Sequence, residues 1–369
     1  MTMTLSQLSI YPIKSMQGLN LMQAKVNESG FEFDRQFMLS QLDGTFITAR
    51  QYPQLLLLTP KLTHTGLIVT APNKSAIVVN YNEFSSQLEL TNVWGNYFYS
   101  HIASINVNRW FSDYLQRDVQ LRWLGHASTR RVKHYPTLPL SFADGYPYLL
   151  LNRSSFDEVD RRCRQSLAIS QFRGNIIIDG APAFAEDSWK TIKIGKIIFE
   201  VTKPCSRCVL TTVNVKTAQP EPNKEPLSVL STFRRDEQGE IDFGINMVAL
   251  NEGILHVGDK VELLATKPAK PYIIKTETAP IKTPQGQPSQ PITIEYHQQA
   301  FIGNTEQTLL EQLEHHNISI PYSCRVGLCG KCRIRLIAGK IKPLTSNAIQ
   351  SNQQILACSC IPEGDIKID

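Results

Sequence analysis

The sequence has no segment typical of secretion or of a membrane span. Its N-terminus lacks a basic region followed by an apolar stretch, and the longest aliphatic run, Leu55 to Leu58, is too short to cross a bilayer. Without such segments we expect a soluble cytoplasmic protein that has no membrane partner.

Neither sign of charge dominates. The chain contains no run of five or more like charges, and its 38 basic and 33 acidic residues leave a formal net charge of +5. This modest excess suits an anionic small ligand or an acidic redox partner as well as it suits nucleic acid, so charge alone decides little. We do not predict a nucleic-acid partner.

What the sequence does contain is enough chain for two or three domains and an unusual arrangement of cysteines. A chain of 369 residues with 42% hydrophobic residues can bury a separate core in each domain. Seven of the eight cysteines fall in three tight clusters. In a reducing compartment, such clustering indicates metal binding or redox chemistry rather than disulfides.

A proline-rich stretch divides the chain. The stretch that begins at Thr266 and ends with Pro291 contains six prolines, Pro291 included, and almost no apolar residues, which is typical of an extended linker. Before it, alternating apolar residues predict a pair of strands, Ile192–Ile194 and Ile197–Val201, on either side of a turn at Gly195 and Lys196, and a further strand at Val209–Val215. Helical spacing predicts a helix over Val107–Leu115, and a capping box predicts another that begins at Ser155. The many short strands indicate a mainly β protein with barrel-like architecture.

The last domain carries a loop with the spacing C-x4-C-x2-C, formed by Cys324, Cys329 and Cys332. A predicted strand (292–296) and a capping box (308–311) precede this loop. A fourth cysteine follows about twenty-five residues later, which matches the plant-type [2Fe-2S] pattern. We assign Cys358 as that ligand and keep Cys360 as the alternative. A zinc site is the competing interpretation, but zinc favours paired C-x2-C knuckles and leaves the x4 spacing unexplained.

Two nucleotide signatures are missing. The chain has neither a G-x-G-x-x-G fingerprint nor an Arg-x-Tyr-Ser/Thr flavin signature. Because a [2Fe-2S] cluster only passes single electrons, we expect it to receive them from a separate NAD(P)H-dependent flavoprotein reductase and to deliver them to a centre in the N-terminal region.

The third cysteine cluster is the pair Cys205 and Cys208, which the pattern places directly after a strand. The neighbouring Lys203 and Arg207 favour the thiolate form. From spacing alone, this pair could be half of a metal site, a thiol-disulfide pair or a structural feature.

The first 265 residues resemble the MOSC-domain proteins, in particular the mitochondrial amidoxime-reducing components, and the whole chain resembles bacterial fusions of MOSC domains to a ferredoxin. The segments that carry the resemblance are Ile10-Tyr-Pro-Ile-Lys14-Ser15, Asp34-Arg35, Thr48-Ala-Arg50, Phe142-Ala-Asp144, Phe172-Arg173-Gly-Asn175, Ala185-Glu-Asp-Ser-Trp189, Cys205 to Thr212, and Val257-Gly-Asp259. The resemblance implies a MOSC N-terminal β-barrel domain (1–120), a MOSC β-barrel domain (121–265), a linker (266–290) and a β-grasp ferredoxin domain (291–369).

The resemblance also implies a molybdenum cofactor with a molybdopterin ligand. The family's cysteine ligand to molybdenum falls on Cys208, which would be the catalytic residue, and Cys205 is then a neighbour. The family's phosphate and pterin contacts fall on Lys14, Ser15, Arg35, Arg173, Asn175, Ser206 and Arg207. Cationic and amide side chains suit an anionic phosphate and a polar pterin edge. Asp144 is a candidate either for orienting an arginine near the cofactor or for a place on a proton path.

From these features we predict a molybdenum-dependent reductase of N-hydroxylated compounds, such as hydroxylaminopurine-like bases, hydroxylamines and amidoximes. Two alternatives stay open. MOSC domains also end molybdenum-cofactor sulfurases, so Cys208 could carry a persulfide for sulfur transfer, although such transfer needs no one-electron relay. The chain could instead be a pure electron carrier, but that interpretation leaves the Arg and Asn pattern without a purpose.

Overall fold

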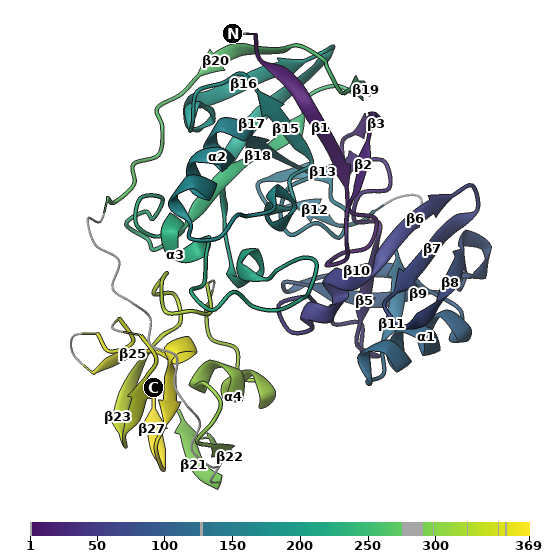
Figure 1. Cartoon of the computed structure of the whole chain (residues 1–369). Helices are drawn as coiled ribbons and strands as arrows, with labels where there is room; N and C mark the ends of the chain where they lie inside the picture. Colours follow the sequence, from purple (N-terminus) through teal and green to yellow (C-terminus); the bar gives the residue numbers. More distant parts are fainter. Residues whose placement is uncertain are drawn as a thin grey trace. The chain divides into compact units, whose positions relative to one another are not determined.

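The computed structural model describes residues 2–125, 128–274, 291–297, 299–322, 324–345, 347–350 and 353–369 (Figure 1). Most of the predicted linker, 275–290, lies outside the described residues. The chain forms two compact units. The first comprises residues 1–205, 213–219 and 244–270, and the second comprises 206–212, 220–243 and 271–369. Cys208 and the C-terminal module therefore belong to the same unit.

The first unit is built around an eight-stranded sheet with the order β2-β1-β15-β14-β18-β17-β16-β20. A cluster of buried hydrophobic side chains packs against this sheet, among them Ile192, Ile194 and Phe199, each fully buried. The predicted strand pair across Gly195 is present as β16 and β17. The strands are β1 (Thr4–Ile10), β2 (Leu19–Leu21), β14 (Tyr148–Asn152), β15 (Ile176–Asp179), β16 (Trp189–Ile194), β17 (Ile197–Ser206), β18 (Asp242–Ala249) and β20 (Val261–Thr266).

Among the described residues of the N-terminal region, four smaller sheets complete the strands, in the orders β5-β11-β10-β9, β6-β7-β8, β19-β3-β4 and β12-β13. Their bounds are β3 (Gln23–Asn27), β4 (Gly30–Phe31), β5 (Phe37–Ser40), β6 (Thr59–Thr63), β7 (Gly66–Ala71), β8 (Lys74–Asn80), β9 (Leu88–Val93), β10 (Asn96–Ile102), β11 (Gln120–Trp123), β12 (Arg131–Val132), β13 (Tyr135–Pro139) and β19 (Gly253–His256). The fold class is mainly β, as predicted.

Helices are few and short. The predicted helix at 107–115 is α1 (Ile105–Leu115), which buries Val107, Trp110 and Phe111. The remaining α-helices are α2 (Arg153–Arg162), α3 (Leu227–Leu230) and α4 (Leu309–His315). The 3-10 helices are η1 (Pro53–Leu57), η2 (Tyr81–Glu83), η3 (Ile169–Phe172), η4 (Ala185–Ser188), η5 (Val209–Thr212) and η6 (Ala357–Ser359).

The predicted start of α2 at Ser155 is wrong. The helix begins two residues earlier, and Asn152 caps it by accepting a hydrogen bond from the Ser154 N–H at 3.2 Å. The Ser155 hydroxyl instead donates to the buried Glu186 carboxylate at 2.7 Å and accepts from the Phe184 N–H. A tertiary contact therefore uses the hydroxyl that the sequence pattern assigned to a cap.

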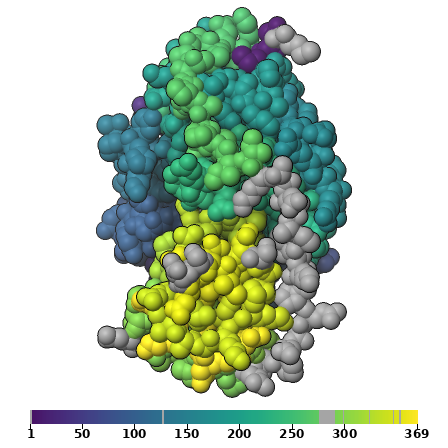
Figure 2. All heavy atoms as spheres, turned by 90° about the vertical axis from the view of Figure 1, so that its left-hand side faces the viewer, coloured from purple at the N-terminus to yellow at the C-terminus, as the bar shows by residue number. Residues whose placement is uncertain are grey.

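The C-terminal module is a five-stranded sheet of order β22-β21-β27-β23-β25, with β21 and β27 paired in parallel. Helix α4, opened by the predicted capping box of Thr308 and Glu311, packs its leucines into the core of this sheet. Figure 2 shows the heavy atoms of the described residues of this module in yellow and yellow-green. A separate two-stranded sheet pairs β24 with β26. The strands of the module are β21 (Pro291–Tyr296), β22 (Gln299–Asn304), β23 (Arg333–Ala338), β24 (Ile341–Pro343), β25 (Gln354–Leu356), β26 (Cys360–Pro362) and β27 (Ile366–Ile368).

Candidate functional site

The four predicted cluster cysteines lie together in the C-terminal module. Cys324, Cys329 and Cys332 occupy the loop before β23, and Cys358 lies in η6; all four are buried. The sulfurs of Cys332 and Cys358 are 3.1 Å apart. Cys360 points elsewhere, with its sulfur 3.6 Å from the Ala348 carbonyl oxygen.

Backbone N–H groups are aimed at these sulfurs. Cys324 Sγ accepts from the N–H groups of Leu328 and Cys329, both at 3.2 Å, and Cys358 Sγ accepts from Gly327 at 3.2 Å. Cys329 Sγ accepts from Cys324 at 3.4 Å and from Lys331 at 3.5 Å. N–H donors stabilise thiolates and tune the cluster that they hold. The donor set therefore fits an iron-sulfur cluster.

Local backbone geometry explains how the loop wraps the sulfurs. Gly327 has a φ of 74°, and a β-carbon there would approach the Ser359 hydroxyl at 2.5 Å. A side chain would thus disturb the N–H group that points at Cys358. Among the described residues, no three His, Cys, Asp or Glu side chains are placed to hold a single metal ion. A [2Fe-2S] cluster needs only two thiolates at each iron.

Cys208 lies at a corner of the chain, between β17 and η5. The predicted strand at 209–215 is wrong, because residues 209–212 form a 3-10 helix. The Thr211 hydroxyl donates to the Cys208 carbonyl at 2.9 Å, and the Thr212 hydroxyl donates to the Val209 carbonyl at 2.8 Å. These side-chain bonds favour a turn over a strand. The corner leaves the Cys208 side chain half-buried.

The residues before Cys208 are bonded within the second unit. The Arg207 N–H donates to the Ile241 carbonyl, and its Nε donates to the Phe243 carbonyl, both at 2.7 Å. The Ser206 hydroxyl donates to the Glu240 carboxylate. Arg207 therefore fixes the approach of the chain to Cys208, in addition to any contact that it makes with a ligand.

In the first unit, Lys14 is buried in a network of charges. Its Nζ donates to the Phe142 carbonyl at 2.8 Å and forms an ion pair with Asp144. Burial lowers the pKa of Lys14 to about 8, although Asp144 partly opposes this effect. Burial alone would raise the pKa of Asp144, but Lys14 and Arg50 outweigh it and hold that pKa well below its usual range. Lys14 is thus mostly cationic at neutral pH.

A second cationic cluster surrounds Tyr11. The guanidinium carbons of Arg35 and Arg173 lie 4.4 and 4.2 Å from the centre of the Tyr11 ring. Arg35 is paired with Asp34 and also donates to the Arg173 carbonyl at 3.1 Å. Burial lowers the pKa of Arg173 to about 10, so this guanidinium remains charged at neutral pH. Two cations beside a single carboxylate leave an excess of positive charge.

Asn175 and Ser15 are both buried. The Asn175 amide donates to the Ser9 carbonyl at 3.1 Å and accepts from the Leu149 N–H at 3.3 Å, so it ties β1 to β14. Ser15 has a φ of 72°, in the left-handed region that non-glycine residues seldom adopt. Such strained positions persist where the surrounding structure enforces them.

A polar cavity of about 270 Å³ opens beside the Tyr11 cluster. A hydrogen-bonded set of Gln7, Ser9 and Asn20 forms part of its wall. Arg173 and Lys216 add positive charge, and no carboxylate is among its described lining residues. The cavity therefore favours an anionic or hydrogen-bonding ligand.

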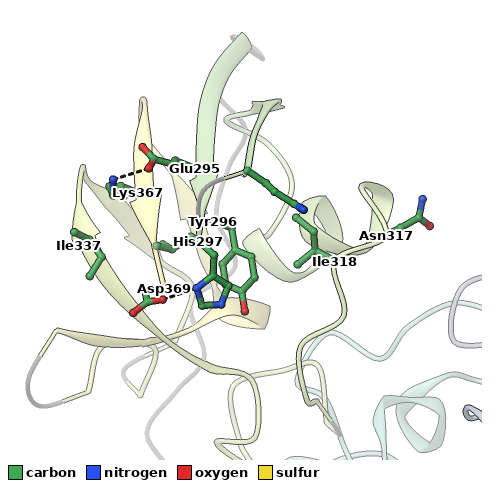
Figure 3. Close-up of a pocket in the computed structure, with 10 residues that line it drawn as sticks. Glu295, Tyr296, His297, Asn317, Ile318, Ile337, Lys367 and Asp369 are labelled. Atoms are coloured by element: carbon green, nitrogen blue, oxygen red, sulfur yellow. Dashed lines mark hydrogen bonds and ion pairs between the residues drawn. The ribbon is translucent and has the colours of Figure 1, made fainter.

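A larger cavity, of about 740 Å³, lies in the C-terminal module (Figure 3). Its charged groups are already paired, because Lys367 bonds Glu295 and the His297 ring lies 2.7 Å from Asp369. None of the four cluster cysteines lines it. This cavity offers no free charge with which to select a ligand.

Sequence reasoning missed the Tyr11 ring and the partners of Asp144. Tyr11 and Arg50 stand inside segments that carry the family resemblance, which was the available signal. Trp94, whose Nε1 donates to Asp144 at 3.0 Å, and Arg130, which donates to the Asp144 carbonyl at 3.1 Å, gave no signal.

Three family models match the chain. Residues 2–118 match the MOSC N-terminal beta barrel domain, residues 137–262 match the MOSC domain, and residues 292–363 match the 2Fe-2S iron-sulfur cluster binding domain. A MOSC domain implies molybdenum cofactor binding, and the C-terminal domain binds a 2Fe-2S cluster. Among the described residues, no helix is both long enough and apolar enough to cross a membrane.

Characterised relatives cover most of the N-terminal region. Mitochondrial amidoxime reducing component 2 of Rattus norvegicus is 31% identical over 280 residues, which are 70% of this chain and 82% of the relative. Component 2 of Homo sapiens is 30% identical over 278 residues, with coverages of 70% and 82%. Component 1 of Homo sapiens is 29% identical over 282 residues, with coverages of 71% and 83%.

Solved structures give weaker matches. Phthalate dioxygenase reductase is 21% identical over 24% of this chain and 29% of that chain, with a TM-score of 0.22. The YUAD protein from Bacillus subtilis is 10% identical over 71% of this chain and 94% of that chain, with a TM-score of 0.34. These scores are too low to support a further argument.

Proposed function

Because this chain belongs to the family of the mitochondrial amidoxime reducing components, we propose that it is a molybdenum-cofactor-dependent oxidoreductase that reduces N-hydroxylated compounds with electrons from its own [2Fe-2S] cluster. Amidoximes, hydroxylamines and hydroxylaminopurine-like bases are the substrate classes. The observation that carries the proposal is the combination, in one chain, of this family's MOSC region with four buried cysteines, three of whose sulfurs accept hydrogen bonds from backbone N–H groups of the cysteine loop.

The overall reaction consumes two electrons and two protons and releases the oxygen of the N–OH group as water. When bound, the molybdenum cofactor supplies a centre that accepts oxygen and two electrons, and the cluster supplies those electrons singly. The proposed donor to the cluster is a separate NAD(P)H-dependent flavoprotein reductase, because this chain carries neither nucleotide signature.

The chain's own residues would hold the cofactor and set its charge. Cys208 would supply the thiolate ligand to molybdenum. The proposed contacts to the pterin and phosphate are Lys14, Ser15, Arg35, Arg173, Asn175, Ser206 and Arg207. The fit rests on charge, because Lys14 is cationic at neutral pH and the Tyr11 cluster has excess positive charge, as an anionic phosphate requires.

Metal content tests the proposal first. Protein purified from a host competent in molybdenum-cofactor synthesis should contain about one molybdenum and two irons per chain by elemental analysis. It should also convert an aryl amidoxime to the amidine when reduced methyl viologen supplies electrons. Two irons without molybdenum, together with no amidoxime reduction, would turn the assignment toward sulfur transfer or a bare electron carrier.

Lys14 should make cofactor binding depend on pH. Below pH 8 the ammonium is already charged, whereas above pH 8 binding of the anion must take up a proton. The affinity of cofactor-free protein for molybdopterin should therefore fall by up to about tenfold per pH unit above pH 8. Lys14→Met should bind more weakly at pH 7 and lose this pH step. Fluorescence titration between pH 7 and 9 measures both effects.

Lys25→Met is the matched control for Lys14→Met. Lys25 is an exposed lysine in the same unit with a long ion pair to Glu32 of 3.9 Å. Lys25→Met should leave the affinity for molybdopterin and the pH dependence of that affinity unchanged. If the affinity of Lys14→Met for molybdopterin still fell above pH 8 as in the unmodified protein, Lys14 would not be one of the cofactor contacts.

A further inference from the structure

A short turn in the second unit contacts both the cluster loop and the segment that leads to Cys208. Residues 236–240 form this turn: the Asp236 N–H donates to the Glu240 carbonyl at 2.9 Å, and the Gly239 N–H donates to the Asp236 carbonyl at 3.1 Å. The Asp236 carboxylate also accepts from the Glu240 N–H at 2.7 Å. These bonds fix the backbone of the turn at Glu240.

Glu240 has a partner on each carboxylate oxygen. Oε1 pairs with the Lys331 ammonium, and Oε2 accepts from the Ser206 hydroxyl. Lys331 lies between the cluster ligands Cys329 and Cys332, and its own N–H donates to Cys329 Sγ. Ser206 lies two residues before Cys208. One carboxylate thus joins the two segments that carry the proposed redox centres.

Gly239 brings the backbone of the turn against the cluster loop. Its φ is 82°, and a β-carbon at this position would lie 1.8 Å from the Cys329 carbonyl oxygen. No side chain could fit there without moving one of the two segments. The turn therefore makes two contacts with the loop, one through the Glu240 side chain and one directly between peptide groups.

We propose that the turn 236–240 is the internal contact through which electrons leave the ferredoxin module, with Glu240 as a positioning residue. This inference rests on the function proposed above. With both centres in place, one electron at a time would pass from the reduced cluster toward the centre at Cys208; no bond would form or break, and Glu240 would be neither oxidised nor reduced. Its charge holds Lys331, and with it Cys329, close to the strand end that carries Ser206.

The test compares Glu240→Gln with Glu237→Gln in the full-length holoenzyme. Glu237 is an exposed residue of the same turn. Its replacement by Gln therefore removes the same charge but leaves the contacts of Glu240 with Lys331 and Ser206 in place. After rapid one-electron reduction of the cluster, decay of its electron paramagnetic resonance signal and growth of the Mo(V) signal report internal transfer. We expect Glu240→Gln to slow this transfer about tenfold, while Glu237→Gln keeps the rate of the unmodified protein. Amidoxime reduction driven by methyl viologen, which reaches molybdenum directly, should be equal in all three.

A second readout does not depend on molybdenum. Hydrogen exchange at residues 236–240 and 324–332 should accelerate in Glu240→Gln and stay unchanged in Glu237→Gln, because only the former loses a contact. The charge exchange E240K/K331E should restore both slow exchange and fast transfer. Equal behaviour of Glu240→Gln and Glu237→Gln in both measurements would overturn the inference. Failure of the proposed function looks different, because the unmodified protein would then not reduce an amidoxime even with methyl viologen.

Discussion

Replacing Cys208 with alanine should abolish the reduction of N-hydroxylated substrates while leaving the visible absorption of the cluster intact. The expected loss exceeds about a hundredfold, because even changes to residues behind a metal ligand cost 10- to 100-fold in metal affinity or activity. The cluster should survive because its four proposed ligands all lie between residues 324 and 358. Molybdenum content, amidoxime reduction and the visible spectrum measure the three consequences.

Cys205→Ala is the control for this change. Cys205 is also half-buried and lies three residues earlier, at the end of β17, so the substitution removes a thiol from the same segment. It should keep molybdenum and most of the activity. Full activity in Cys208→Ala would refute its role as ligand, and cyanide-releasable sulfur on Cys208 in a protein without molybdenum would favour sulfur transfer.

The second large effect concerns the choice between Cys358 and Cys360. Cys358→Ala should reduce iron from about two atoms per chain to almost none. Cys360→Ala should retain the cluster. Both thiols are buried, so the two substitutions remove similar volumes, but only the sulfur of Cys358 lies 3.1 Å from Cys332 and accepts an N–H bond from the loop. Iron analysis and the visible spectrum distinguish the two variants.

Loss of the cluster from Cys360→Ala together with its retention in Cys358→Ala would reverse the assignment. A modest loss of stability in Cys360→Ala is compatible with the prediction, since removing a buried side chain leaves a cavity. Thermal unfolding of each variant separates that effect from loss of iron.

The features that could be predicted from the sequence are those set by neighbouring residues. The cysteine loop was one, because three of its cysteines and two of its glycines fall within nine positions, and the spacing alone constrains how they meet. The strands around Gly195 and the cap at Thr308 were others, since alternation and capping act over a few residues. Mainly β architecture followed from the same local patterns.

The errors arose where a hydroxyl had a choice of partner. Ser155 matched a capping box, but its hydroxyl bonds Glu186, 31 residues away. Val209 to Val215 alternated like a strand, but the hydroxyls of Thr211 and Thr212 turn the backbone into a 3-10 helix. The contact of Glu240 with Lys331 joins residues 91 positions apart, and no local pattern marks either of them. Such pairings depend on tertiary structure.

The hydrogen bonds from backbone N–H groups to the cysteine sulfurs are distributed unevenly, so some sulfurs are better placed than others to carry negative charge. Of the five such bonds within the described residues, four end on Cys324 and Cys329 and one ends on Cys358. Added negative charge is therefore accommodated better on the Cys324 and Cys329 side. Cys329, on that side, is also the residue whose peptide group lies against Gly239. An electron held by this loop would then reside close to the turn 236–240, the contact that we propose as its exit, so the hydrogen bonds themselves would favour transfer in that direction.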